Sequence, residues 1–293
     1  MMKTKTSEKL FYRINEILLI LMVLLIIYPV IYVIAASFSG RDAIVQGRVT
    51  LFPVDFNVEA YKYLFADKTI WVAYLNAIYY TFVGTLVSLI VTISGAYPLS
   101  KSYLKGNRII SFIVSTTLWI NAGMIPQFLN FRDLGLVNTR TAIIIGFACS
   151  TYNFILMRNF FSSIPKALEE AAKIDGAGHF RILTSIYLPL SMPSLATITL
   201  FYAVAKWNSY LWPMILLQEE SMMPIQVVIK KLIVDMQGLS MKEGSVDVGL
   251  FNTFSNESLL YAGIVVSALP MIILYPFIQK HFTKGVMVGA VKG

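Results

Sequence analysis

Six stretches of the chain are strongly apolar and contain no charged residue. Each is close to or longer than the roughly 20 residues that a helix needs to cross about 30 Å of hydrocarbon. The pattern therefore predicts an all-α integral membrane protein with six transmembrane helices, in residues 17–38, 69–100, 109–131, 141–157, 182–205 and 258–279. The fourth stretch is the shortest, and residues 159–161 extend it if the Arg158 side chain reaches along the helix to the membrane surface.

The segments 39–68 and 218–257 connect these stretches on one side of the membrane. Residues 225–236 of the second segment alternate apolar residues with Lys230, Lys231 and Asp235 at helical spacing, which predicts a short amphipathic helix at the outer surface. Such a helix suits a docking surface for a partner protein, and it equally suits a solvated loop.

The segment 162–185, on the opposite side, has the signals of a short helix that ends in a sharp turn. Pro165 suits the first turn of a helix and Gly176 its end, so the sequence predicts a helix over residues 166–174 and a second one over 180–185. Small and apolar residues then share one narrow face of the first helix, which a partner's backbone can approach closely. They are Leu168, Ala171, Ala172 and Asp175.

Composition supports a membrane protein, because 57% of residues are hydrophobic and only 14% are charged, against roughly 25% charged in soluble domains. Fourteen Lys and Arg residues fall on the side of the N-terminus and nine on the other, and Lys206 lies within a stretch. Because cytoplasmic flanks carry the excess of Lys and Arg, both termini are predicted to be cytoplasmic. The net charge of +8 therefore reflects membrane topology and does not indicate nucleic-acid binding.

The chain is predicted to form one membrane domain over residues 17–280, with the loop 162–185 on its cytoplasmic side. Residues 1–16 and 281–293 form cytoplasmic ends. The first apolar stretch is longer than the 7 to 15 apolar residues of a signal peptide, so a retained helix is expected. Cys149 is the only cysteine and is expected to be a small apolar filler within the fourth helix.

One motif combines residues of the loop 162–185. It is Glu170-Ala171-Ala172, then Gly176 after three residues, and Ile186-Tyr187-Leu188-Pro189 after nine more. This segment resembles the cytoplasmic "EAA" loop of permease subunits of binding-protein-dependent ABC importers. Other stretches are similar to the maltose-type carbohydrate permeases, in the order Ala96-Tyr97-Pro98-Leu99-Ser100-Lys101, Leu134-Gly135-Leu136, Asn138-Thr139, Trp207-Asn208, Trp212-Pro213 and Gly289-Ala290-Val291-Lys292-Gly293.

The resemblance implies the type I importer permease fold and a division of labour among subunits. The partners would be a second permease, two ATPase subunits and an external solute-binding protein. ATP and Mg²⁺ would bind to the ATPase subunits, and this chain has no phosphate-binding G-x-x-x-x-G-K-[ST] loop. By resemblance, a cleft of the ATPase would receive the loop residues Glu169, Glu170, Ala171, Ala172, Asp175, Gly176 and Ala177.

A simpler interpretation of the loop charges is a solvated surface helix. Glu169 and Glu170 lie four and three residues before Lys173, and such pairs stabilise a helix by about 0.2–0.5 kcal/mol each. Helix stabilisation does not explain the two alanines, the glycine or the Ile-x-Leu-Pro sequence at their fixed spacing.

The predicted solute pathway rests on polar residues within the apolar stretches. Lys206 either extends to the outer membrane surface, which the sequence favours, or lines an outer cavity with aromatic residues that stack on sugar rings. The candidates are Lys206, Trp207, Asn208, Tyr210, Trp212, Asn76 and Asn121, with Gln127 and Asn130 as further wall residues. The resemblance implies an oligosaccharide as solute, and a non-sugar solute such as a peptide remains the alternative.

Other classes of protein fit the sequence less well. Ion-coupled carriers place acidic or His groups in mid-membrane, but all sixteen acidic residues lie outside the six stretches. No set of side chains within the stretches suits an intramembrane enzyme, so no catalytic residue is predicted. His179 and His281 lie in the cytoplasmic segments without further ligands, so no metal site is predicted.

Overall fold

The structure is a computed structural model that describes residues 6–240 and 257–273. Every regular element within these residues is a helix. The helices are α1 (Thr6–Ser37), α2 (Arg41–Val45), α3 (Glu59–Ala66), α4 (Lys68–Leu99), α5 (Asn107–Thr116), α6 (Met124–Asp133), α7 (Arg140–Ile145), α8 (Thr151–Ser163), α9 (Lys166–Ile174), α10 (His179–Ile182), the π-helix η1 (Leu183–Tyr187), α11 (Leu188–Leu190), α12 (Met192–Trp207), α13 (Leu211–Leu216), the 3₁₀ turn η2 (Glu220–Met222), α14 (Ile225–Ser240) and an unlabelled helix Glu257–Ile273.

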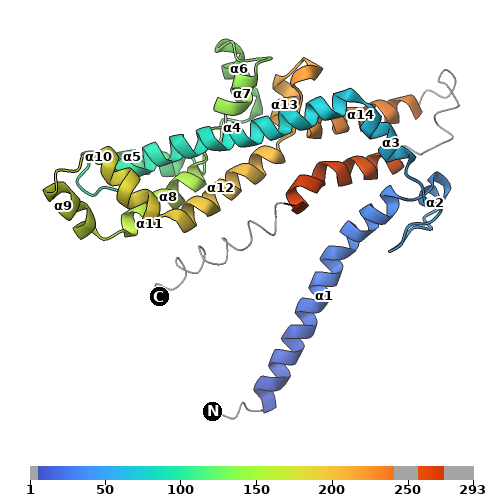
Figure 1. Cartoon of the computed structure of the whole chain (residues 1–293), viewed down its shortest axis with the longest axis horizontal. Coiled ribbons are helices and arrows are strands. Elements are labelled where there is room, and N and C mark those ends of the chain that lie inside the picture. Colours follow the sequence, from blue (N-terminus) through green and yellow to red (C-terminus); the bar gives the residue numbers. More distant parts are fainter. Residues whose placement is uncertain (1–5, 241–256, 274–293) are drawn as a thin grey trace. The chain divides into compact units, whose positions relative to one another are not determined.

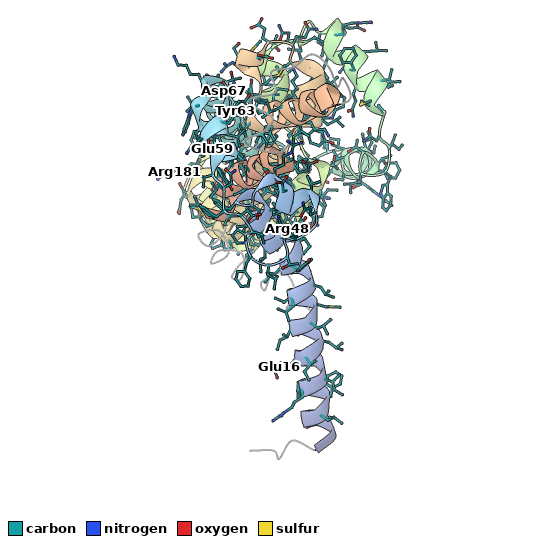
Figure 2. All side chains as sticks on the ribbon, turned by 90° about the vertical axis from the view of Figure 1, so that its right-hand side faces the viewer. Glu16, Arg48, Glu59, Tyr63, Asp67 and Arg181 are labelled. Carbon is teal, nitrogen blue, oxygen red and sulfur yellow. The ribbon has the colours of Figure 1, made fainter. Side chains whose placement is uncertain are left out.

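The described residues fall into two compact units, and the first holds residues 6–68 with the described part of 229–269. Helix α1 is exposed along nearly its whole length, and Figure 2 shows its side chains, Glu16 among them, projecting on all sides. A small apolar core of Ala35, Ala36, Ala43, Ile44 and Val49 packs where α1 ends. An apolar helix with no burial suits a lipid or protein environment.

The second unit holds residues 69–228 with 270–273, and its frame is the pair α4 and α12 (Figure 1). The two helices touch in opposite directions, because Thr92 bonds Tyr202 at 2.6 Å and Gly84 faces Lys206. One core cluster lies around Tyr97, Phe161 and Tyr187, whose rings meet edge to face with centroids 5.1–6.2 Å apart. The second cluster lies around Phe131 and Trp212.

The first two predicted spans are continuous helices, which confirms that part of the sequence prediction. By length and hydropathy, Leu10–Ser37 and Lys68–Leu99 suit a membrane crossing. A third crossing exists if His179–Leu190 and Met192–Trp207, which meet at a bend of 84°, count as one. The helix Glu257–Ile273 covers the described part of the sixth stretch, whose remainder lies outside the described residues.

The third and fourth stretches are not continuous helices, so that prediction is corrected. Residues 117–123 separate α5 from α6, where Gly123 has a φ of 83° and the side chain of Asn121 accepts a hydrogen bond from its amide at 2.9 Å. Residues 146–150 separate α7 from α8, where Gly146 ends one helix and the Ser150 side chain caps the next. Local capping bonds outcompete the helix at both places.

Candidate functional site

The loop helix α9 forms as the sequence predicts, over Lys166–Ile174. Gly176, with a φ of 77°, turns the chain, and the amide of Ala177 bonds the carbonyl of Ala172 at 2.9 Å. These bonds satisfy carbonyl groups at the end of the helix. The second predicted helix is instead α10 followed by the π-helix η1, and Figure 1 shows α9, α10 and α11 gathered at one end of α12.

The two faces of α9 differ in exposure. Leu168, Ala171 and Asp175 of the predicted face are exposed, whereas Ala172 is half-buried against the core, as is Ala177 beyond the turn. Two apolar side chains that the sequence did not single out are the most exposed of the loop, Ile174 at 87% and Phe180 at 79%. An apolar tip of this kind suits a protein contact.

Glu169 is the buried residue of α9, with a side chain only 6% exposed. Its carboxylate accepts hydrogen bonds from Lys101 Nζ at 2.7 Å, Tyr103 OH at 2.8 Å and Tyr187 OH at 2.9 Å, and pairs with Lys173 Nζ at 2.8 Å. The solvated ion pair that the simpler interpretation predicted is therefore corrected, because the Glu169 carboxylate lies inside the protein.

Burial alone would raise the pKa of Glu169, but hydrogen bonds from Lys101, Lys173, Tyr103 and Tyr187 outweigh it and hold the pKa at about 2. The ammonium of Lys101 is equally buried and lies 3.5 Å from the ring centroid of Tyr187 and 4.2 Å from that of Tyr97. Each buried charge therefore has an opposite charge and polar or aromatic neighbours, as buried ions require.

A cavity of about 780 Å³ lies in the second unit, beside the break between α7 and α8. Its wall includes the aromatic side chains of Phe147, Tyr152, Phe201 and Trp212, and the amides of Gln127, Asn130 and Asn153. This volume and this mixture of aromatic and amide groups suit an organic solute. Cys149 also lines the cavity and is exposed, so its prediction as an apolar filler is corrected.

Lys206 lines the same cavity, and its ammonium is bound within the protein. Its Nζ donates to the carbonyls of Phe147 at 3.1 Å and Ile143 at 3.2 Å, at the end of α7, where the helix dipole favours a cation. The predicted extension of Lys206 to the membrane surface is therefore corrected. Of the described residues that line the cavity, Lys206 alone carries a charge.

The structure brings Lys206 and Trp212 together at the cavity, with Gln127 and Asn130, and places the other pathway candidates elsewhere. Trp207 is buried against Tyr74, and Asn76 donates to the carbonyls of Ser221 at 2.8 Å and Met223 at 3.1 Å. Asn208, Tyr210 and Asn121 are exposed and lie outside the cavity wall. Tyr152 and Phe201, which sequence reasoning missed, show no signal beyond aromaticity.

An all-helical chain with apolar helices, a rigidly held exposed loop helix and an internal cavity defines the class of membrane transport subunits. The chain belongs to the family of binding-protein-dependent transport system inner membrane components, which it matches over residues 1–288. It is therefore a permease subunit of a binding-protein-dependent ABC importer.

Three known proteins are similar to it. The polygalacturonan/rhamnogalacturonan transport system permease protein YtcP of Bacillus subtilis is 38% identical over 100% of both chains. A chain of a bacterial ABC transporter involved in the import of the acidic polysaccharide alginate is 45% identical, with a TM-score of 0.86 over 96% of this chain and 100% of that one. A chain of a bacterial alginate transporter in complex with an alginate pentasaccharide-bound periplasmic protein shares the fold alone, with 16% identity and a TM-score of 0.57 over 93% of both chains.

Proposed function

We propose that this chain is one of two permease subunits of an ATP-driven importer in a bacterial cytoplasmic membrane. It crosses the membrane six times, with both termini in the cytoplasm, and ATP is hydrolysed on two separate ATPase subunits. An external binding protein delivers the solute. The exposed helix α9, held firmly to the body of the second unit, is the observation that carries the proposal.

In this proposal, the tip of the loop docks into a cleft of the ATPase. Glu170, Ala171 and Asp175 lie on its exposed side, with the apolar Ile174 and Phe180 as anchors. Gly176 shapes the turn, and Ala172 and Ala177 pack the helix onto the protein behind it. Glu169 lies on that inner side as well.

Cysteine crosslinking tests the docking. A cysteine at Ala171 should form a crosslink with the ATPase subunit, and Ile174→Asp should reduce the amount of ATPase that co-purifies, because burying an unpaired carboxylate is unfavourable. Lys62→Asp places the same group on the exposed side of α3 and serves as the control. Unchanged co-purification of Ile174→Asp would refute the docking site.

We further propose that the solute is an oligosaccharide and that it is acidic. The similar proteins are named for pectic polysaccharides and alginate, and the lone charge on the cavity wall is the cation of Lys206. A positive potential without an acidic neighbour favours a carboxylate over a neutral solute. In this proposal, the aromatic rings of Trp212 and Phe147 stack on the sugar rings.

The native thiol of Cys149 tests whether the solute occupies the cavity. A galacturonate trimer, delivered by the binding protein to the complete transporter, should slow alkylation of Cys149. The methyl ester of the same trimer has no charge and should protect less. Lys206→Gln should reduce uptake of the acid more than uptake of the ester, whereas equal losses would mean that Lys206 only holds α7 in place.

A further inference from the structure

The carboxylate of Glu169 joins segments that are far apart in the sequence. Lys101 and Tyr103 belong to the turn after α4, 68 and 66 residues away, and Tyr187 ends the π-helix η1, 18 residues away. All three meet the carboxylate with donor-to-acceptor distances of 2.7–2.9 Å. The same turn contacts α9 a second time, because Lys166 Nζ donates to Ser102 Oγ at 3.0 Å.

These contacts exceed what the helix itself needs. The pair with Lys173, four residues along, stabilises α9 alone. The bonds from Lys101, Tyr103 and Tyr187 instead fix α9 to two other segments, and the Tyr187 ring packs into the aromatic core with Tyr97 and Phe161. A loop that only connected two helices would not require a buried ion pair, whose desolvation is costly.

The contacts also resist bending. A buried ion pair cannot separate by a small distance without leaving two charges poorly solvated, so it holds one geometry. The carboxylate uses both oxygens, Oε1 for Tyr103 and Lys173 and Oε2 for Lys101 and Tyr187. Rotation of α9 about its axis would therefore break bonds on both oxygens.

We propose that Glu169 is a positioning residue that makes α9, the inner end of α4 and η1 move as one rigid body during the transport cycle. The inference rests on the proposed docking of the loop on an ATPase. When the ATPase moves α9, the displacement then reaches α4 and α12 together, and the loop does not absorb it by flexing. Glu170, next in the chain, is exposed and has no part in this connection.

Spin-label distances within the assembled transporter test the inference without requiring the solute. Labels on Ala167→Cys in α9 and Lys105→Cys after α4, both exposed positions, are placed in a Cys149→Ser background. The distance distribution between them should be narrow and the same in the nucleotide-free and vanadate-trapped complexes. With Glu169→Gln, which removes the charge and keeps the shape, the distance should broaden and shift between the two states.

Two further variants keep the outcome decisive. Glu59→Gln removes the carboxylate of an exposed ion pair with Lys62 on α3 and should leave the distance unchanged (Glu59 is labelled in Figure 2). If Glu169→Gln prevents assembly, Tyr103→Phe removes one bond to the same carboxylate and should give a smaller broadening.

A distance that stays narrow and constant in Glu169→Gln, or in Tyr103→Phe when that variant decides, would overturn the inference. So would a distance that already changes between the two states of the unsubstituted protein. Failure of the docking proposal itself is a separate result, because Ala171→Cys would then form no crosslink with the ATPase.

Discussion

Gly176 is a single residue whose backbone conformation shapes the exposed tip. Its φ of 77° lies in the left-handed region, which costs other residues about 1–2 kcal/mol. Space does not limit a side chain there, since an added Cβ would meet no atom within 4 Å. We expect Gly176→Val to reduce solute uptake while the protein remains in the membrane, and Gly176→Asn to reduce it less, because Asn tolerates this conformation better.

Gly178 provides the control for Gly176, two residues away. Its φ is −73°, and an added Cβ would also meet open space. Gly178→Ser should therefore retain uptake, which is measured in vesicles alongside the amount of inserted protein. Equal loss in Gly176→Val and Gly178→Ser would show that the loop tolerates no side chain, whatever the backbone angle.

The ionisation of Glu169 gives a second prediction for a single residue. Its pKa is about 2, below its ordinary value of 4.5, so the carboxylate contributes stability that is complete above about pH 4.5 and is lost as the pH falls through about 2. Infrared spectra of the wild-type protein minus those of Glu169→Gln should show no protonated carboxyl group at about pH 4. A protonated band at that pH would contradict the described contacts.

Sequence reasoning found the loop but not the role of Glu169. The helix signals of Pro165 and Gly176 are local, so the bounds of α9 could be predicted. The partners of Glu169 come from other elements, and no local pattern distinguishes it from Glu170, which is exposed. The same limit applies to Lys206, whose acceptors are backbone carbonyls about 60 residues away in the sequence, near the end of α7.

Close packing between helices explains two of three glycines that the sequence suggests as packing positions. An added Cβ at Gly84 would lie 3.2 Å from the Lys206 side chain, and one at Gly95 would lie 2.6 Å from the Phe154 ring of α8. Gly123 instead sits in open space at the break after residue 117, where its positive φ is what matters.

The contact of Gly95 with α8 leads to a prediction for the pair of helices. Gly95→Ala should destabilise the protein by about 1–3 kcal/mol, because the ring of Phe154 must move. Thermal unfolding in detergent measures the loss. Phe154→Leu in the same chain should recover part of the stability, and a double variant no better than the sum of the single ones would argue against a direct contact.

Interrupted helices are the feature of the elements that hydropathy could not predict. A charge-free stretch shows that residues can enter a membrane but does not show where a helix stops. The breaks at residues 117–123 and 146–150 depend on Asn121, Gly146 and Ser150, which are also common inside membrane helices. The second break borders the cavity, and non-helical backbone at membrane depth is expected where it lines a pathway.

The orientation of the whole molecule in the membrane can be tested by labelling from one side. In a Cys149→Ser background, Lys62→Cys should react with an impermeant maleimide added outside intact cells, because residue 62 is in the predicted outer segment. Lys105→Cys should react only after the membrane is opened. The reverse pattern would invert the predicted topology and place α9 on the wrong side for an ATPase.

The π-helix η1 holds more residues in a turn than an α-helix does. Deleting one residue, such as Ser185, would allow an α-helix and rotate what precedes or follows it by about 100°. Tyr187 and Glu169 would then no longer share a side. The number of residues between Gly176 and Pro189 is therefore a length constraint on the molecule, so insertions or deletions there should disrupt the register of α9 with α12, even where every remaining side chain is unchanged.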